Sequence, residues 1–262
     1  MTVTTHIDHA RSRLRAERKA VKRKREAFET FADRIAELPT EPAQSATPGI
    51  TATAGPHLHG ESSATDRCRT VRRAFAATIR PHSVADTDGS ESLLATIRTE
   101  FTDPIAVALA PTTEASFSAE LKGAIVAETR VRRTEAETME RTLARERTQL
   151  DDAASTVERI TSWIAEADDT SLLDVGFDAL RARHETLATH RDRCQELADR
   201  RQAFLRDTTT GDSGARIDHR KFVAYLYEDF PVDHPVLSTV ASLDSACTDC
   251  QRSVRNHLVR RV

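Results

Sequence analysis

An apolar residue recurs at every seventh position through the N-terminal part of the chain, and this spacing constrains the fold more than any other feature. The residues of this row are Ile7, Leu14, Val21, Phe28 and Ile35. A second row at the intervening spacing comprises Ala10, Glu17, Lys24, Phe31 and Leu38. Two rows spaced in this way form the seam of a coiled coil. The sequence therefore predicts one long helix within residues 1–38, ended by Pro39, whose apolar face packs on another helix.

The next segment, residues 39–65, has four prolines, three glycines and almost nothing to bury. Such a composition is typical of a disordered linker. Helical patterns resume after it, so the sequence divides into four parts. These are an N-terminal heptad helix (1–38), the linker (39–65), a helical domain (66–205) and a C-terminal helical pair (206–262).

The domain over residues 66–205 reads as a long antiparallel helical hairpin preceded by two short helices, 66–80 and 90–102. A proline-free helical pattern runs over 113–167, with apolar heptad rows that only Glu146 interrupts in its second half. A polar turn follows, in which Ser171 and Asp174 resemble a capping box. The seam of the second arm is marked by Phe177, Leu180, Leu187, Cys194 and Ala198. A short turn between two heptad helices implies antiparallel arms.

The C-terminal part begins with a flexible joint at 206–216 and contains both tyrosines, in KFVAYLYEDFPVDHPVLSTVA. We expect Phe222, Tyr225 and Leu226 to form the inner face of one helix. Asp233 is expected to cap the next helix, with Pro235 in its first turn. The two helices would pack as a helix-turn-helix corner on the hairpin. The predicted fold class is therefore all-α.

Composition restricts the function further. The net charge is −3, so the chain as a whole has no strong preference for nucleic acid or for a membrane. The start of the chain lacks an apolar signal segment, which favours a cytoplasmic protein. Arginines number 33 against five lysines, a usage that suggests a salt-adapted source. No nucleotide-binding, hydrolase or metalloprotease motif occurs, so we expect no catalytic residues, no enzyme activity and no cofactor.

Four cysteines could hold a metal only if they converged: Cys68, Cys194, Cys247 and Cys250. The last two form a CxxC, but zinc sites usually pair two such knuckles. Each cysteine falls on an apolar stripe, which is typical of buried thiols. We therefore expect no metal, with a four-cysteine zinc site as the alternative.

A basic run over residues 11–25 holds nine Lys or Arg and one Glu. Such a run can neutralise phosphates. The alternative is a solvated helix face, because acids follow along the same helix at Glu26 and Glu29. Candidate nucleic-acid contacts are Arg11, Arg15, Arg18, Lys22, Arg23 and Arg25.

Several stretches carry a resemblance: CRTVRRAFAATI, GFDALRARHETLATHRDRC, FVAYLYEDFPVDHPVLSTVASLD and CTDCQRSVRNHLVRRV. The chain resembles, over residues 66–262, an uncharacterised haloarchaeal family that is rich in coiled coil and is a domain of unknown function. The resemblance implies no site residues. Together these observations favour an intracellular interaction or scaffold protein with a protein partner and no membrane contact, as a monomer or homodimer. We expect the first helix to fold back on its own chain. The alternatives are a DNA-associated or regulatory protein and a small cysteine-based metal protein.

Overall fold

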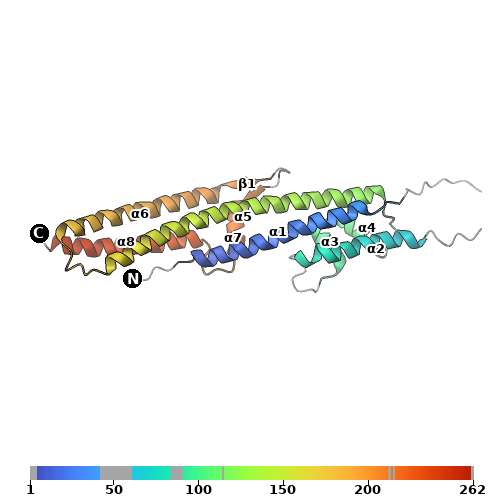
Figure 1. Cartoon of the computed structure of the whole chain (residues 1–262). Helices are drawn as coiled ribbons and strands as arrows, with labels where there is room; N and C mark the ends of the chain where they lie inside the picture. The colour runs from blue at the N-terminus through green and yellow to red at the C-terminus, as the bar shows by residue number, and fades with distance from the viewer. Residues whose placement is uncertain are drawn as a thin grey trace, which may run out of the picture. The chain divides into compact units, whose positions relative to one another are not determined.

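The computed structural model describes residues 5–41, 61–83, 91–113, 115–211, 214 and 216–260, and within them it is all-α apart from one pair of short strands (Figure 1). The predicted fold class is confirmed. Most of the predicted linker, residues 42–60, lies outside the described residues. In chain order the elements are α1 (Ile7–Glu37), α2 (Glu61–Thr78), the 3-10 turn η1 (Arg80–His82), α3 (Leu93–Glu100), α4 (Asp103–Ala108), α5 (Ala119–Asp168), α6 (Phe177–Arg206), β1 (Thr208–Thr210), β2 (Arg216–Asp218), α7 (His219–Leu226) and α8 (Pro235–Val259).

The chain divides into two compact units, and α1 and α5 each contribute residues to both. We call residues 1–18, 138–210 and 215–262 the hairpin unit. Residues 19–137 and 211–214 form the phenylalanine unit. Among the helices that the structure describes, none has both the length and the apolar character needed to cross a bilayer.

The heptad face of α1 is buried against other parts of the same chain. Its fully buried members are Ile7, Ala10, Leu14, Phe28, Phe31 and Ile35, while Val21 is half-buried. The two charged residues of the second row are also paired. Glu17 accepts a hydrogen bond from the Tyr225 hydroxyl at 3.1 Å. Lys24 forms an ion pair of 2.8 Å with Glu100, whose side chain is only 6% exposed.

Four phenylalanine rings form the centre of the phenylalanine unit: Phe28, Phe31, Phe75 and Phe101. The Phe31 ring lies 6.0 Å from Phe75 and 5.7 Å from Phe101, measured between centroids. Burying each such side chain stabilises the fold by roughly 1.5–3 kcal/mol. At the C-terminal end of α1, the Lys122 ammonium donates to the carbonyls of Ala36 and Leu38, both at 2.7 Å. A cation at this end satisfies carbonyls that the helix itself leaves free.

The hairpin unit is built on the second half of α5 and on α6, which run antiparallel (Figure 1). Near the turn, Arg183 donates to the Ala167 carbonyl at 3.0 Å. Far from the turn, both terminal nitrogens of Arg201 donate to the Glu146 carboxylate, at 2.5 and 3.0 Å. Helix α8 packs along α6, where Arg191 pairs with Asp244 at 3.1 Å (Figure 1).

The first turns of α1 pack on the C-terminal elements of the hairpin unit. The His6 amide donates to the Thr239 hydroxyl of α8 at 3.1 Å. Arg13 donates through Nε to the Leu226 carbonyl of α7 at 3.2 Å. The His9 ring stacks on Phe230 with centroids 4.3 Å apart.

The joint predicted at 206–216 contains an element that the sequence did not indicate. Strands β1 and β2 pair antiparallel, with Thr208 opposite Asp218 and Thr210 opposite Arg216. The run of threonines in β1 has good strand propensity. The pair was missed because three-residue strands carry no recognisable alternation. His219 fastens it to α6, because its ring bonds both the Thr209 hydroxyl and the Phe204 carbonyl.

Four local predictions were wrong. Phe177, expected in the seam of the second arm, is 46% exposed. Helix α6 begins at Phe177, and the Ser171 hydroxyl accepts from the Leu173 amide inside the loop rather than capping a helix. The N-cap of α8 is His234, not Asp233, although Pro235 does open the helix. In α7 the Tyr225 side chain is 42% exposed, and the buried tyrosine is Tyr227 at 1%. The stripe prediction failed because the buried face of α7 is formed by Phe222, Val223 and Leu226, which leaves Tyr225 at the edge of that face.

Candidate anion-binding groove on helices α1 and α5

The basic run of α1 places three arginines on one face, because positions i, i+4 and i+7 of a helix are neighbours. Within the hairpin unit this face meets α5 across a cavity of about 520 Å³. We call it the arginine groove. Its lining residues are Asp8, Arg11, Leu14, Arg15 and Arg18 of α1 together with Arg147 and Asp151 of α5.

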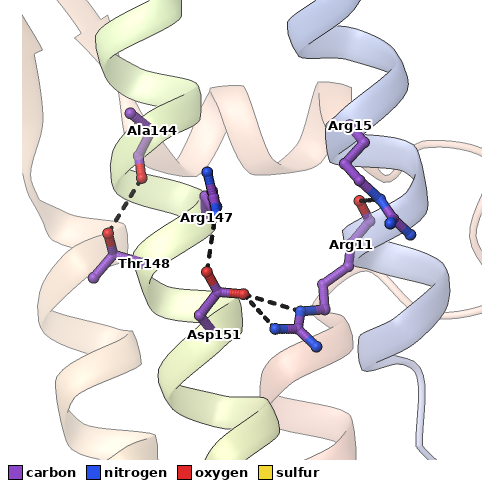
Figure 2. A network of polar contacts seen from close by, with 6 residues as sticks. All are labelled: Arg11, Arg15, Ala144, Arg147, Thr148 and Asp151. Atoms are coloured by element: carbon purple, nitrogen blue, oxygen red, sulfur yellow. Dashed lines mark hydrogen bonds and ion pairs between the residues drawn. The ribbon is translucent and has the colours of Figure 1, made fainter.

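Asp151 lies at the centre of the groove and joins the two helices (Figure 2). Its Oδ1 accepts from Arg11 Nε at 3.0 Å, and its Oδ2 accepts from Arg147 Nε at 3.3 Å. The hydrogen bond from Arg11, aided by the charges of both guanidinium groups, lowers the pKa of Asp151 below its ordinary value. This carboxylate is therefore ionised at neutral pH and holds two of the four guanidinium groups in place.

The other two arginines keep much of their hydrogen-bonding capacity. Arg15 donates to the Arg11 carbonyl at 3.3 Å (Figure 2). It also donates to the Ser12 hydroxyl at 3.0 Å, and both partners belong to its own helix. Arg18 has no ion pair or hydrogen bond with another described residue. Each guanidinium carries five N–H donors, so free donors remain on both side chains. With four arginines and two aspartates, the lining has a formal charge of +2. Such a site suits a carboxylate or a phosphate.

The six predicted nucleic-acid contacts are divided between the two units. Arg11, Arg15 and Arg18 line the arginine groove, whereas the other three belong to the phenylalanine unit. There, Lys22 lies 3.8 Å from Glu26 and Arg25 lies 3.6 Å from Glu29, each pair one helical turn apart. Arg23 is exposed.

The contribution of α5 to the groove was missed. Arg147 and Asp151 are more than 120 residues from the basic run, and nothing in that run points to them. One signal was available: their i, i+4 spacing on the polar flank of a heptad helix is a favourable ion pair. This spacing predicts an ion pair on the surface of the helix, but it does not show which other helix lies beside that pair.

The four cysteines are divided between the two units. The Cys68 thiol, in the phenylalanine unit, donates to the Ala115 carbonyl at 3.5 Å, and burial raises its pKa. In the hairpin unit, Cys194 and Cys247 share a hydrogen bond that lowers the pKa of the first thiol and raises that of the second. Cys250 is half-buried, and burial raises its pKa. Over the described part of the chain, no three His, Cys, Asp or Glu residues gather in a way that could hold a metal ion. The metal-free expectation stays a prediction.

A second polar cluster is enclosed in the hairpin unit. The side chains of Glu146 and Arg201 are both 0% exposed. The Tyr227 hydroxyl donates to Glu146 Oε1 at 2.7 Å, and burial together with this carboxylate raises the tyrosine pKa. Because no solvent reaches these groups, the cluster is suited to holding α5, α6 and the α7–α8 corner together rather than to binding a ligand.

Comparison with protein families gives one match. A family model described as a domain of unknown function, DUF7260, matches residues 5–251. No curated protein matches the chain, and no solved structure matches it. The family match begins earlier than the resemblance over residues 66–262, because it includes α1 and the segment after it, and it ends at residue 251. The chain belongs to the DUF7260 family, a domain of unknown function.

Proposed function

We propose that this protein is a non-catalytic helical interaction protein whose arginine groove binds an acidic segment of a partner protein. The observation that carries the proposal is the arrangement of Arg15 and Arg18. Their guanidinium groups keep free donors beside a fixed Arg11–Asp151–Arg147 bridge. Because the bridge joins α1 to α5 beside these two arginines, an incoming carboxylate would meet them on a helix face that is already in place. Bidentate contacts of this kind are the stronger class of charged hydrogen bond.

A protein partner is favoured over nucleic acid by the charges within the groove. Asp8 and Asp151 lie among the arginines and would repel a continuous line of phosphates. A protein segment can offer both signs of charge, so it can satisfy both sets of residues. Lys22 and Arg25, which a polyanion would need, are already close to acids of their own helix.

Nucleic-acid binding is the second candidate function. The observation that favours it is the density of nine basic residues within residues 11–25. If phosphates bind there, all six basic candidates should contribute similarly, because backbone contacts are largely additive charge neutralisation.

We further propose a salt-adapted cytoplasmic setting and coiled-coil packing for the hairpin. The 33 arginines against five lysines and the resemblance to a haloarchaeal family support the first. The heptad rows of α5 and α6 support the second. Exposed ion pairs weaken in salt, so any binding measurement needs both low and high salt.

The test compares two double variants of the full chain. Arg15→Gln/Arg18→Gln removes the free donors of the groove, and Lys22→Gln/Arg23→Gln removes two equally basic side chains elsewhere on α1. Fluorescence anisotropy is measured with a labelled 15-residue Asp/Glu-rich peptide and with a labelled 20-base-pair DNA duplex. We expect the peptide to bind and the groove variant to weaken it about tenfold or more, since charged hydrogen bonds contribute roughly 1.5–3 kcal/mol. The Lys22/Arg23 variant should bind the peptide like the unmodified chain.

Two results would contradict this function. One is a peptide affinity that is unchanged in the groove variant. The other is DNA binding that exceeds peptide binding, with a steep salt dependence and equal losses in both variants. That second pattern would establish the basic run as a phosphate-binding surface.

A further inference from the structure

A second cavity lies in the hairpin unit, at the turn between α5 and α6. Its volume is about 310 Å³, and α5, α6, α8 and the loop after α5 line it. The apolar part of the lining is formed by Trp163, Ile164, Leu172, Leu187, Cys250 and Val254. This volume is at the small end of binding pockets and suits one large apolar side chain.

Two exposed apolar side chains follow the cavity-lining Leu172 in the sequence. Leu173 follows Leu172 directly and is 73% exposed. Phe177, the first residue of α6, is 46% exposed. Large apolar side chains beside an apolar cavity form the kind of surface that proteins use to bind one another. A ligand that only filled the cavity would leave these two side chains in water.

The same end of the hairpin is acidic. Residues 160–180 contain no lysine or arginine and five carboxylates, all exposed: Glu166, Asp168, Asp169, Asp174 and Asp178. Asp168 itself lines the cavity. Two further charged side chains line it, Arg183 and Asp249. Arg183 donates to the Ala167 carbonyl, and Asp249 pairs with Arg252 at 2.8 Å. Asp249 is thus neutralised, whereas Arg183 keeps its positive charge, and the exposed Arg255 and Arg260 follow the cavity-lining Val254 of α8. Five carboxylates against these three arginines leave this end of the hairpin with a net negative charge.

We propose that this surface binds a cationic amphipathic segment of a partner protein. One large apolar side chain of that segment would enter the cavity, and its lysines or arginines would face the carboxylates of the α5–α6 loop. An anionic lipid surface is disfavoured, because the same carboxylates repel it. This inference goes beyond the proposed function of the arginine groove. The two surfaces prefer opposite charges, so one chain can hold two different partners.

The protein carries its own reporter for this site. Trp163 is the single tryptophan of the chain, and its side chain lines the cavity. The probe is a 14-residue amphipathic peptide of lysine, leucine and phenylalanine, without tryptophan, titrated into the full chain. We expect a saturable change in Trp163 emission. A peptide with glutamate in place of lysine, and one with alanine in place of leucine and phenylalanine, should give no such change.

Four variants of exposed residues test the assignment without disturbing the fold. Ser253→Phe fills the mouth of the cavity, and Leu173→Ser removes the exposed apolar side chain beside it. Asp168→Asn/Asp169→Asn removes charge at the rim. The matched control, Asp192→Asn/Glu196→Gln, removes two exposed carboxylates from the middle of α6. We expect Ser253→Phe to abolish the change and the two rim variants to weaken binding roughly threefold or more. The control should leave the affinity unchanged, and thermal melts should show all four variants folded.

Three outcomes would overturn the proposal. An equal loss in the α6 control would mean that any carboxylate on the surface attracts the peptide. Unchanged binding in both Ser253→Phe and Leu173→Ser would show that the cavity takes no part. Octylamine that binds as tightly as the peptide and is insensitive to Leu173→Ser would make the cavity a small-molecule site. None of these variants touches Arg15, Arg18 or Arg147, so the result is independent of the test of the arginine groove.

Discussion

Glu146 and Arg201 place two opposite charges where no solvent reaches them, since both side chains are 0% exposed. Taking such charges out of water is costly, and the cost is recovered only while each keeps its partner. Tyr227 supplies a further hydrogen bond to the same carboxylate. The same principle operates at Lys24, whose ammonium is paired with the buried Glu100. Each charged residue that interrupts an apolar row thus has a partner from another helix.

Removing one member of the buried pair should therefore cost more than removing both. We expect Arg201→Met to destabilise the protein by about 3–5 kcal/mol, because it leaves the Glu146 charge uncompensated. The triple variant Glu146→Leu/Arg201→Met/Tyr227→Phe should recover much of that loss. Urea unfolding measures both. As a control, Arg191→Met at a half-exposed pair should cost no more than about 1 kcal/mol. A triple variant less stable than the single one would show that the charges are net stabilising.

His190 makes stability depend on pH. Its side chain is 4% exposed, and neither ring nitrogen has a hydrogen-bond partner among the described residues. Burial, with the nearby charges of Arg193 and Arg159, lowers its pKa below the ordinary value. The unfolded chain therefore takes up this proton first as the pH falls. The free energy of unfolding therefore falls as the pH drops below about 6.5, the pKa of histidine in the unfolded chain. The fall ends once the pH is below the lower pKa of His190 in the folded protein.

Thermal melts between pH 7.5 and 5.5 check this prediction. The melting temperature of the unmodified chain should fall as the pH is lowered over this range. The melting temperature of His190→Phe, which keeps a ring against Trp163, should fall by less. Arg193→Gln should also reduce the dependence, because it removes one of the charges that lower the pKa. The same slope in all three proteins would show that other groups govern acid stability.

At the scale of elements, α1 contributes residues to both units. Its buried face contacts the C-terminal elements of the hairpin unit through its first turns, and the phenylalanine core through its last. A face that is already covered by its own chain is not free to pair with a second copy. We therefore expect α1 to stay folded back on its own chain rather than to form a dimer through this seam.

Core substitutions on α1 should therefore change stability and leave the mass in solution unchanged. Phe28→Ala is expected to cost about 3–5 kcal/mol, because Phe28 is 1% exposed. Val21→Ala, at a half-buried position of the same row, should cost clearly less. Urea unfolding gives the free energies, and sedimentation equilibrium gives the mass. A dimer that dissociates on Val21→Ala would show that the seam faces another molecule.

The long helices could be predicted from the sequence because their heptad rows carry the signal locally. The strand pair could not, since its register depends on contacts that three-residue segments do not encode. For the arginine groove, Arg11, Arg15 and Arg18 were found from one helix, while Arg147 and Asp151 required the packing of a distant one. The cavity beside Trp163 was not predicted at all, because its shape depends on the conformation of the α5–α6 loop.

For the whole molecule, the feature that matters most is that α1 and α5 run unbroken through both units. Each unit has its own core, which by itself would allow independent unfolding. Shared helices oppose this, because a helix that loses its packing in one unit loses cooperative support for its backbone hydrogen bonds in the other. We therefore expect the two units to unfold together.

Phe75→Ala tests this coupling, because it removes a ring from the core of the phenylalanine unit. Trp163 reports on the hairpin unit, and far-ultraviolet circular dichroism reports on all helices. In urea, both signals should change at one midpoint in the unmodified chain, and both should move to lower urea in the variant. A tryptophan midpoint that stays in place while the dichroism becomes biphasic would show two independent units.

The bond between the His6 amide and Thr239 joins residues 233 positions apart. During synthesis, the first turns of α1 leave the ribosome long before α7 and α8 exist. At about 5–20 residues per second, they wait on the order of 10–50 s for their partners. The α5–α6 hairpin, whose arms are neighbours in sequence, needs no such delay. We therefore expect the apolar face around Ile7, Ala10 and Leu14 to stay exposed on the nascent chain and to need protection by a chaperone.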